Sequence, residues 1–236
     1  MEIKHPIKKL DFPDRDITII VNTDIEFIYR ARACAKEPFT VDWIRDTAHN
    51  GVFYDVGANV GSYSLIAASL MAEDNGVVVS FEPAYFNFYK LCENISINKF
   101  NKRIIPLNVA LTNTNMLLDM HFADTRFGSS NNLSDAGSSV FTTVLGIRLD
   151  DAVENYGIPF PNHIKIDVDG SEESVLEGGK RTFHDNRLQS VMIEVNNANP
   201  EECSHVYQFM ADAGFVIRQT GQLISKNLSN VLFARS

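Results

Sequence analysis

The sequence predicts an α/β fold with a mostly parallel sheet, because short apolar runs alternate along the chain with segments of helical periodicity. Residues 52–56 and 77–81 form two such runs, and a carboxylate lies at the end of each. Between them, residues 60–71 carry apolar side chains at helical spacing. A strand, turn, helix and second strand in this order bring both carboxyl ends to one edge of the sheet, where ligands bind.

The turn after the first run contains Asp55, Gly57 and Gly61. Glycines let backbone N–H groups and a helix N-terminus face an anionic ligand group. Asp55, however, disfavours a pyrophosphate and attracts a cationic amine or sulfonium. The glycines also lack the Gly-x-Gly-x-x-Gly spacing of a dinucleotide loop. The turn therefore favours a zwitterionic ligand.

The second run ends at Glu82 and is stopped by Pro83. An acidic residue at this point accepts hydrogen bonds from both ribose hydroxyls of a nucleoside. The turn at Asp55 and the site at Glu82 would therefore accommodate the amino-acid end and the nucleoside end of one ligand. S-adenosyl-L-methionine has both.

Together with later segments, these motifs resemble the FkbM family of methyltransferases. The matching segments are Asp55-Val-Gly-Ala-Asn-Val-Gly61, Phe81-Glu-Pro83, Asn94 with Asn98, Val109-Ala-Leu111, Ile164-Lys-Ile-Asp-Val-Asp-Gly-Ser-Glu172 with Val175-Leu176 and Gly178, and Ile193-Glu194. The resemblance implies a Rossmann-like class I methyltransferase fold, with a mostly parallel seven-stranded sheet, helices on both faces and a final antiparallel hairpin. It also implies S-adenosylmethionine-dependent O-methylation of a hydroxyl on a sugar or secondary metabolite, and it adds Asn59 to the expected cofactor contacts. It does not name the acceptor.

The length of 236 residues suits one compact domain. We expect residues 51–236 to form the S-adenosylmethionine-binding methyltransferase domain. Residues 1–50 would be an N-terminal extension that covers the sheet or shapes the acceptor site, or one that only caps a sheet edge.

With 21 Lys and Arg against 30 Asp and Glu, the chain has a formal charge of −9. This charge and the lack of a dense basic run exclude nucleic acid as an expected partner. Neither a signal peptide nor an apolar run long enough to span a membrane is recognisable, so we expect a cytoplasmic protein that does not bind membranes. Three widely spaced cysteines indicate neither disulfides nor a zinc site. The oligomeric state is not predicted.

The rest of the chain continues the alternation. We expect further strands at 17–22, 104–111, 117–122, 140–146, 163–168, 191–195, 214–219 and 231–234, and helices at 41–48, 85–100, 147–156, 172–183 and 201–213. Asn108, near the end of the third strand of the sheet, would face the adenine edge or cap a loop. The polar segment 123–139 would be a mobile lid or a simple insertion.

The acceptor side requires a group that removes or masks a hydroxyl proton. Asp167, at the end of the 163–168 strand, is the first choice, as general base or as holder of the hydroxyl; its structural alternative is a helix N-cap or an interstrand hydrogen bond. Glu194 is the second. A divalent cation held by Asp167, Glu194 and Asn196 is a rival that we do not expect. His121 could reach the acceptor, whereas His163 lies at the far end of its strand and is expected to be structural.

Two other function classes remain open. A nicotinamide-dependent dehydrogenase shares the acid after the second strand but lacks the third glycine here. A cofactor-binding protein without turnover would share every binding motif.

Overall fold

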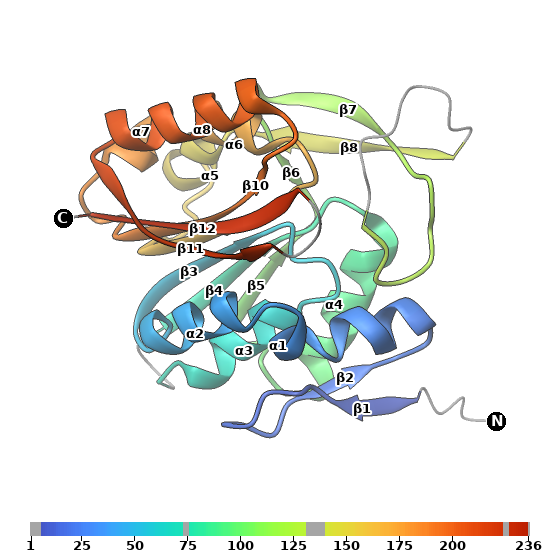
Figure 1. Ribbon diagram of the computed structural model, residues 1–236. Coiled ribbons are helices and arrows are strands. Elements are labelled where there is room, and N and C mark those ends of the chain that lie inside the picture. The colour runs from blue at the N-terminus through green and yellow to red at the C-terminus, as the bar shows by residue number, and fades with distance from the viewer. Residues whose placement is uncertain (1–5, 73–75, 131–139, 224–226, 236) are drawn as a thin grey trace.

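The computed structural model describes residues 6–72, 76–130, 140–223 and 227–235, and a seven-stranded sheet lies at its centre (Figure 1). The strand order is β11-β12-β10-β9-β3-β4-β5. Their bounds are β3 Gly51–Val56, β4 Gly76–Phe81, β5 Ile104–Leu107, β9 His163–Ile166, β10 Ser190–Asn196, β11 Phe215–Leu223 and β12 Leu228–Arg235. Strand β12 runs antiparallel to both of its neighbours, and β3, β4, β5, β9 and β10 are paired in parallel. The expected sheet and its final antiparallel hairpin are confirmed.

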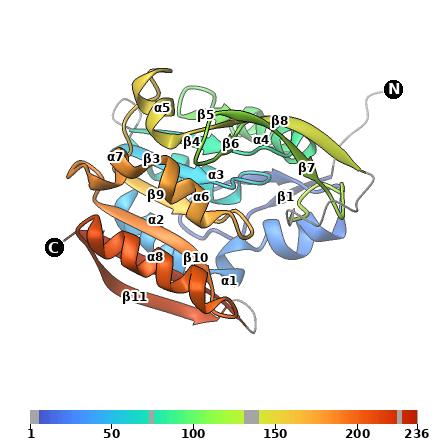
Figure 2. The same ribbon diagram turned by 90° about the horizontal axis from the view of Figure 1, so that it is seen from above.

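Helices cover both faces of this sheet, as expected. On one face lie α2 (Pro38–Thr47), α3 (Ser62–Leu70) and α4 (Tyr85–Ile97); on the other lie α5 (Leu149–Glu154), α6 (Glu172–Gly178), α7 (Lys180–His184) and α8 (Pro200–Asp212), as Figures 1 and 2 show. The central strands are apolar on both sides because each side packs under helices. In β3, Phe53 packs into the hydrophobic core on the side of α2 and α3, and Tyr54 packs into the core on the side of α5 to α8. No helix in the described part of the chain is both long and apolar enough to span a membrane.

The N-terminal segment packs beside α4. It contains β1 (Ile7–Lys9), β2 (Thr18–Ile20), the π-helical turn η1 (Glu26–Arg30) and α1 (Ala33–Lys36). The Asn94 side chain accepts a hydrogen bond from Ile20 N–H at 2.8 Å and donates one to the Val60 carbonyl at 2.9 Å. Asn98 exchanges hydrogen bonds with the backbone of Thr18. The two asparagines therefore tie β2 to α4, and Asn94 also holds the glycine turn.

The strand expected at 104–111 is divided between two sheets, which corrects the prediction. Strand β5 ends at Leu107, and the separate strand β6 (Ala110–Leu111) joins a three-stranded sheet of order β6-β8-β7 with β7 (Met116–His121) and β8 (Phe141–Ile147). The break lies at Asn108, whose side chain donates hydrogen bonds to the carbonyls of Glu82 and Pro83.

The helix expected at 172–183 is likewise two helices, α6 and α7, which meet at Gly179. Asp150 explains the second start, because its buried carboxylate accepts hydrogen bonds from the N–H groups of Arg181 and Thr182 at 3.1 and 2.9 Å. The first N–H groups of a helix have no partner within that helix, so a carboxylate that accepts their hydrogen bonds fixes the point where a new helix begins.

Part of the polar segment 123–139 is described, and residues 131–139 lie outside the described ranges. Its first part is fixed. The Ser129 carbonyl accepts hydrogen bonds from Asn59 and Asn87, and the Gly128 carbonyl accepts one from Arg30. The lid interpretation concerns the undescribed residues and stays a prediction.

Candidate functional site

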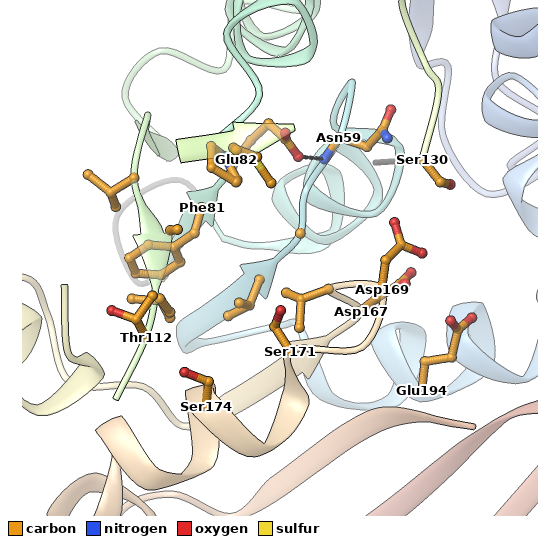
Figure 3. A pocket seen from close by; sticks show the side chains of 18 of the residues that line it. Asn59, Phe81, Glu82, Thr112, Ser130, Asp167, Asp169, Ser171, Ser174 and Glu194 are labelled. Carbon is orange, nitrogen blue, oxygen red and sulfur yellow. Dashed lines mark hydrogen bonds between the residues drawn. The ribbon is translucent and has the colours of Figure 1, made fainter. Parts of the chain in front are cut away.

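A cavity of about 490 Å³ opens at the carboxyl ends of the central strands (Figure 3). Its size suits a nucleoside-sized ligand. Several segments far apart in the sequence contribute to it. The polar and charged side chains that line it are Arg30, Lys36, Asn59, Glu82, Thr112, Asn113, Ser130, Asp167, Asp169, Ser171, Ser174 and Glu194.

The glycine turn forms one part of the cavity wall. Gly57 has a φ of +83°, and a Cβ added to it would lie 1.9 Å from the Asp167 carbonyl oxygen. Only glycine therefore fits between β3 and the segment after β9. Asn59 is also left-handed, with a φ of +52°, and its amide group donates to the Ser129 carbonyl. Gly57 and Asn59 line the cavity, whereas Gly61 does not.

Glu82 lies beside this turn, as expected for a residue that holds a ribose. Its carboxylate accepts a hydrogen bond from the N–H group of Asn59 at 2.7 Å (Figure 3) and another from that of Ala84 at 2.9 Å. Burial raises the pKa of Glu82 to about 7, although these two N–H donors act in the opposite direction. A carboxylate has about four lone-pair sites, so two remain for ligand hydroxyls.

Asp55 lies below the cavity and is not among its lining residues. It is 1% exposed; one oxygen accepts a hydrogen bond from Ser64 Oγ at 2.5 Å, and the other has no hydrogen-bond partner in the described structure. Burial raises the pKa of Asp55. The expected direct contact between Asp55 and a cationic ligand group is therefore not one that the structure prepares.

Lys165 lies on β9 opposite Asp55 in the register, and it is 1% exposed. Its ammonium is 2.7 Å from Asp167 Oδ2 and lies over the Tyr63 ring, 4.8 Å from the ring centroid. Burial alone would raise the pKa of Asp167, but the charge of Lys165 holds it below its usual value. Asp167 is therefore a fixed negative charge at the cavity floor.

Two more carboxylates flank Asp167. One oxygen each of Asp167, Asp169 and Glu194 lies within 4.8 Å of the others. Burial, and then the nearby Asp167, raise the pKa of Glu194 to about 8 and also raise that of Asp169. Asn196, expected beside Glu194, instead accepts a hydrogen bond from Ala198 N–H and does not line the cavity.

The other candidates lie away from the cavity. Asn108 supports the backbone of Glu82 rather than lining the cavity, which agrees with the loop-capping alternative. His121 is absent from the cavity lining as well. His163 lies 2.7 Å from Ser190 Oγ, and burial lowers its pKa to about 4. The structural role expected for His163 is consistent with this geometry.

Sequence reasoning missed the cations of the site. Arg30 and Lys36 come from the N-terminal segment and line the cavity, and the Lys36 ammonium lies 2.7 Å from Glu37. No sequence motif around these two residues indicates that they line a binding cavity. A lysine inside the apolar run Ile164-Lys-Ile166 was, in contrast, a visible signal, because a buried lysine needs an acidic partner.

Comparison with known proteins agrees with this geometry. Residues 55–217 match the family model described as the methyltransferase FkbM domain. Hexuronic acid methyltransferase AglP of Haloferax volcanii is 29% identical over 168 residues, which are 71% of this chain and 64% of that protein. The chain thus covers slightly less than two thirds of that relative.

Solved structures show the same fold at low identity. The methyltransferase FkbM of Methylobacillus flagellatus KT superposes with a TM-score of 0.56 at 15% identity, over 78% of this chain and 43% of that one. Aeropyrum pernix fibrillarin, solved with natively bound S-adenosyl-L-methionine, gives a TM-score of 0.50 at 11% identity, over 79% and 67%. The expected class I methyltransferase fold is confirmed.

Proposed function

The chain belongs to the FkbM methyltransferase family, and on that premise we propose that it transfers the methyl group of S-adenosylmethionine to a hydroxyl of a sugar or secondary metabolite. One observation carries the proposal. A single cavity has the glycine turn and Glu82 on one side and the carboxylates of Asp167 and Glu194 on another (Figure 3). The first pair suits a nucleoside, and the second suits an acceptor hydroxyl.

The cofactor side is built to hold a ligand. Glu82 keeps lone pairs for ribose hydroxyls, and its two N–H partners fix the direction of its carboxylate. The backbone at Gly57 approaches closely because no side chain intervenes. Bound S-adenosylmethionine would supply an electrophilic methyl group on a sulfonium. The surplus of carboxylates over cations in the cavity lining favours a ligand that carries this positive charge.

On the acceptor side, Asp167 and Glu194 would fix the hydroxyl and receive or direct its proton. Alignment of the hydroxyl oxygen with the methyl group supplies much of the acceleration in such a displacement. Lys165 holds Asp167 in one orientation through the 2.7 Å ion pair. Glu194 is 8% exposed and faces the same cavity.

The acceptor class is supported by the relative named for a hexuronic acid, which is an oxidised sugar. Arg30 and Lys36 in the cavity lining would suit an acceptor that carries a carboxylate. We therefore place sugars and sugar acids first among small-molecule acceptors, ahead of other secondary metabolites.

Two measurements test the proposal. In a thermal-shift series, S-adenosylmethionine and S-adenosylhomocysteine should raise the melting temperature, whereas NAD should not; the reverse result would support a dehydrogenase. Transfer of labelled methyl to a panel of neutral sugars, uronic acids and hydroxylated metabolites should then give product. Cofactor binding without product on any acceptor would favour a binding protein without turnover.

A further inference from the structure

Arg30 is the cation of the cavity lining that no described carboxylate neutralises. Its Nε donates to the Gly128 carbonyl at 2.8 Å and its Nη2 to Ser130 Oγ at 3.2 Å, and both acceptors are neutral. Its Nη1 has no partner among the described residues. Lys36, the other cation, differs because its ammonium lies 2.7 Å from the Glu37 carboxylate. A half-buried guanidinium that bonds only to neutral groups keeps its charge available for an anionic ligand group.

The position of Arg30 is fixed beside the glycine turn. Ser62 begins α3 directly after this turn, and its Oγ donates to the Arg30 carbonyl at 2.9 Å. Segment 128–130 accepts the hydrogen bonds of the guanidinium, and its central carbonyl accepts another from Asn59 Nδ2 at 2.9 Å. Figure 3 shows Ser130 on the side of the cavity where Asn59 lies. The guanidinium is therefore held at the end of the cavity that the glycine turn forms.

The charge of Arg30 reaches both functional sides of the cavity. Burial raises the pKa of Glu82, and Arg30 is among the groups that oppose this rise. Against burial, Lys165 and, more weakly, Arg30 lower the pKa of Asp167. Arg30 thus lies within electrostatic reach of the ribose side and of the acceptor side. A cofactor that has its ribose at Glu82 and its methyl group directed at the acceptor would place its amino-acid end in the same region.

We propose that Arg30 binds the carboxylate of the cofactor's amino-acid group, an assignment that rests on the function proposed above. The free N–H groups of Nη1 can donate to this carboxylate, and so can the hydroxyl of Ser130, which lines the cavity. Arg30 is then the residue by which the protein distinguishes S-adenosylmethionine from nucleosides that lack this group. The N-terminal segment would belong to the cofactor site, and Lys36 would remain as the cation for an acidic acceptor.

Two ligands that differ only in this carboxylate test the proposal. Calorimetric titration of the full chain compares S-adenosylhomocysteine with its decarboxylated form, which keeps the ammonium group. The wild type should bind S-adenosylhomocysteine about 10–100-fold more tightly, because only this ligand offers an anion to the guanidinium. Arg30→Met should bind the two ligands within about threefold of each other. Arg187→Met, at a surface arginine paired with Asp185, is the matched control and should keep the wild-type preference.

A second variant separates binding from a structural role. Arg30→Gln is neutral but keeps an N–H donor for segment 128–130, so it should lose the preference for the carboxylate even if Arg30→Met does not fold. Equal losses of affinity for both ligands in the two variants would show that Arg30 only supports segment 128–130, and would overturn the proposal. An unchanged preference in the variants, with a raised KM for the acceptor, would assign Arg30 to the acceptor and also overturn it.

The wild-type titrations distinguish this inference from the proposed function. If the wild type binds both ligands equally well, the inference is overturned and the proposed function stands. If the wild type binds neither ligand, nor S-adenosylmethionine itself, the proposed function fails and the assignment of Arg30 fails with it.

Discussion

Lys165 and Asp167 lie on the same face of the sheet, two residues apart, and their charged groups meet at 2.7 Å under the cavity. The register places Asp55 on that face as well, opposite Lys165. One buried ammonium thus stabilises the buried carboxylate of Asp55 and the half-buried one of Asp167, and it also acts on Glu37. The pair connects the fold to the site, because the residue that holds Asp167 in place is itself in the core.

Lys165→Met should destabilise the protein by about 3–5 kcal/mol, because it leaves buried carboxylates without their cation. Urea denaturation followed by circular dichroism measures the change. Lys9→Met is the control, since Lys9 pairs with Asp16 at the surface and both side chains are largely exposed; its effect should be small. Equal stability of the two variants would show that the nearby carboxylates do not need the charge of Lys165 for the protein to keep its stability.

Asp167→Asn should keep the shape of the side chain but remove its charge. Turnover on the true acceptor should fall by roughly 10²–10⁴-fold, while S-adenosylhomocysteine binds within a few-fold of wild type. Asp185→Asn, on the surface beside Arg187, controls for the loss of one charge. Near-normal turnover of folded Asp167→Asn would remove Asp167 from the acceptor site and direct attention to Glu194.

Glu82→Gln should weaken S-adenosylhomocysteine binding by about 1–3 kcal/mol, because the ribose hydroxyls lose a charged acceptor. The pKa of about 7 adds a pH dependence. Below this pH Glu82 holds a proton and is a poorer acceptor; above it the carboxylate is ionised. Wild-type affinity should therefore rise by about tenfold from pH 6 to pH 8.

The Glu82→Gln variant should lose this part of the pH dependence in calorimetric titrations. If the affinity for S-adenosylhomocysteine changed equally with pH in the two proteins, a group other than Glu82 would be the one that titrates.

Gly57→Ala should abolish cofactor binding and lower stability, because the new methyl group would lie 1.9 Å from the Asp167 carbonyl oxygen. Gly157→Ala is a matched control. Gly157 has a φ of +68° but no heavy atom within 4 Å of the added Cβ, so only backbone strain of about 1 kcal/mol is expected. Calorimetry and thermal unfolding of both variants separate the steric effect from the strain. Normal binding by Gly57→Ala would contradict the tight approach of the two segments.

Asn94→Ala should cost about 2–4 kcal/mol, because it leaves the Ile20 N–H and the Val60 carbonyl without their buried partner. Asn155→Ala, which removes an exposed amide that donates a hydrogen bond to Asp151, should change stability by less than about 0.5 kcal/mol. Chemical denaturation compares them. A small effect of Asn94→Ala would mean that apolar packing and the hydrogen bonds of Asn98 with Thr18 hold β2 without Asn94.

The sequence was sufficient to predict the sheet, since the buried parallel strands have continuous apolar runs that end in recognisable carboxylates. Glu82 was placed correctly in the cavity wall for that reason. Asp55 was expected there too, but a strand's last residues alternate between faces, and the alternation points Asp55 into the core beside Ser64. Lys165 and Asp167 are two residues apart, so the same alternation places them on one face, and their pairing could have been predicted from it.

Other features were outside the reach of sequence patterns. Arg30 and Lys36 reach the cavity because the N-terminal segment folds back beside α4. That contact depends on hydrogen bonds that the N–H groups of Thr18 and Ile20 donate to the side chains of Asn98 and Asn94. The break between β5 and β6 depends on the Asn108 side chain bonding to the chain after β4. Local periodicity carries no information about such long-range hydrogen bonds.

Because β6 leaves the main sheet, the cavity is lined by residues from two separate sheets. Gly57, Glu82 and Asp167 follow strands of the main sheet, whereas Met116, Leu118 and Met120 come from β7 in the three-stranded sheet. Substitutions in β7 can therefore reshape one wall while the wall that contains Gly57 and Glu82 keeps its geometry. An enzyme designer would vary these three positions first, and divergence of acceptor choice within such a scaffold can proceed along the same wall.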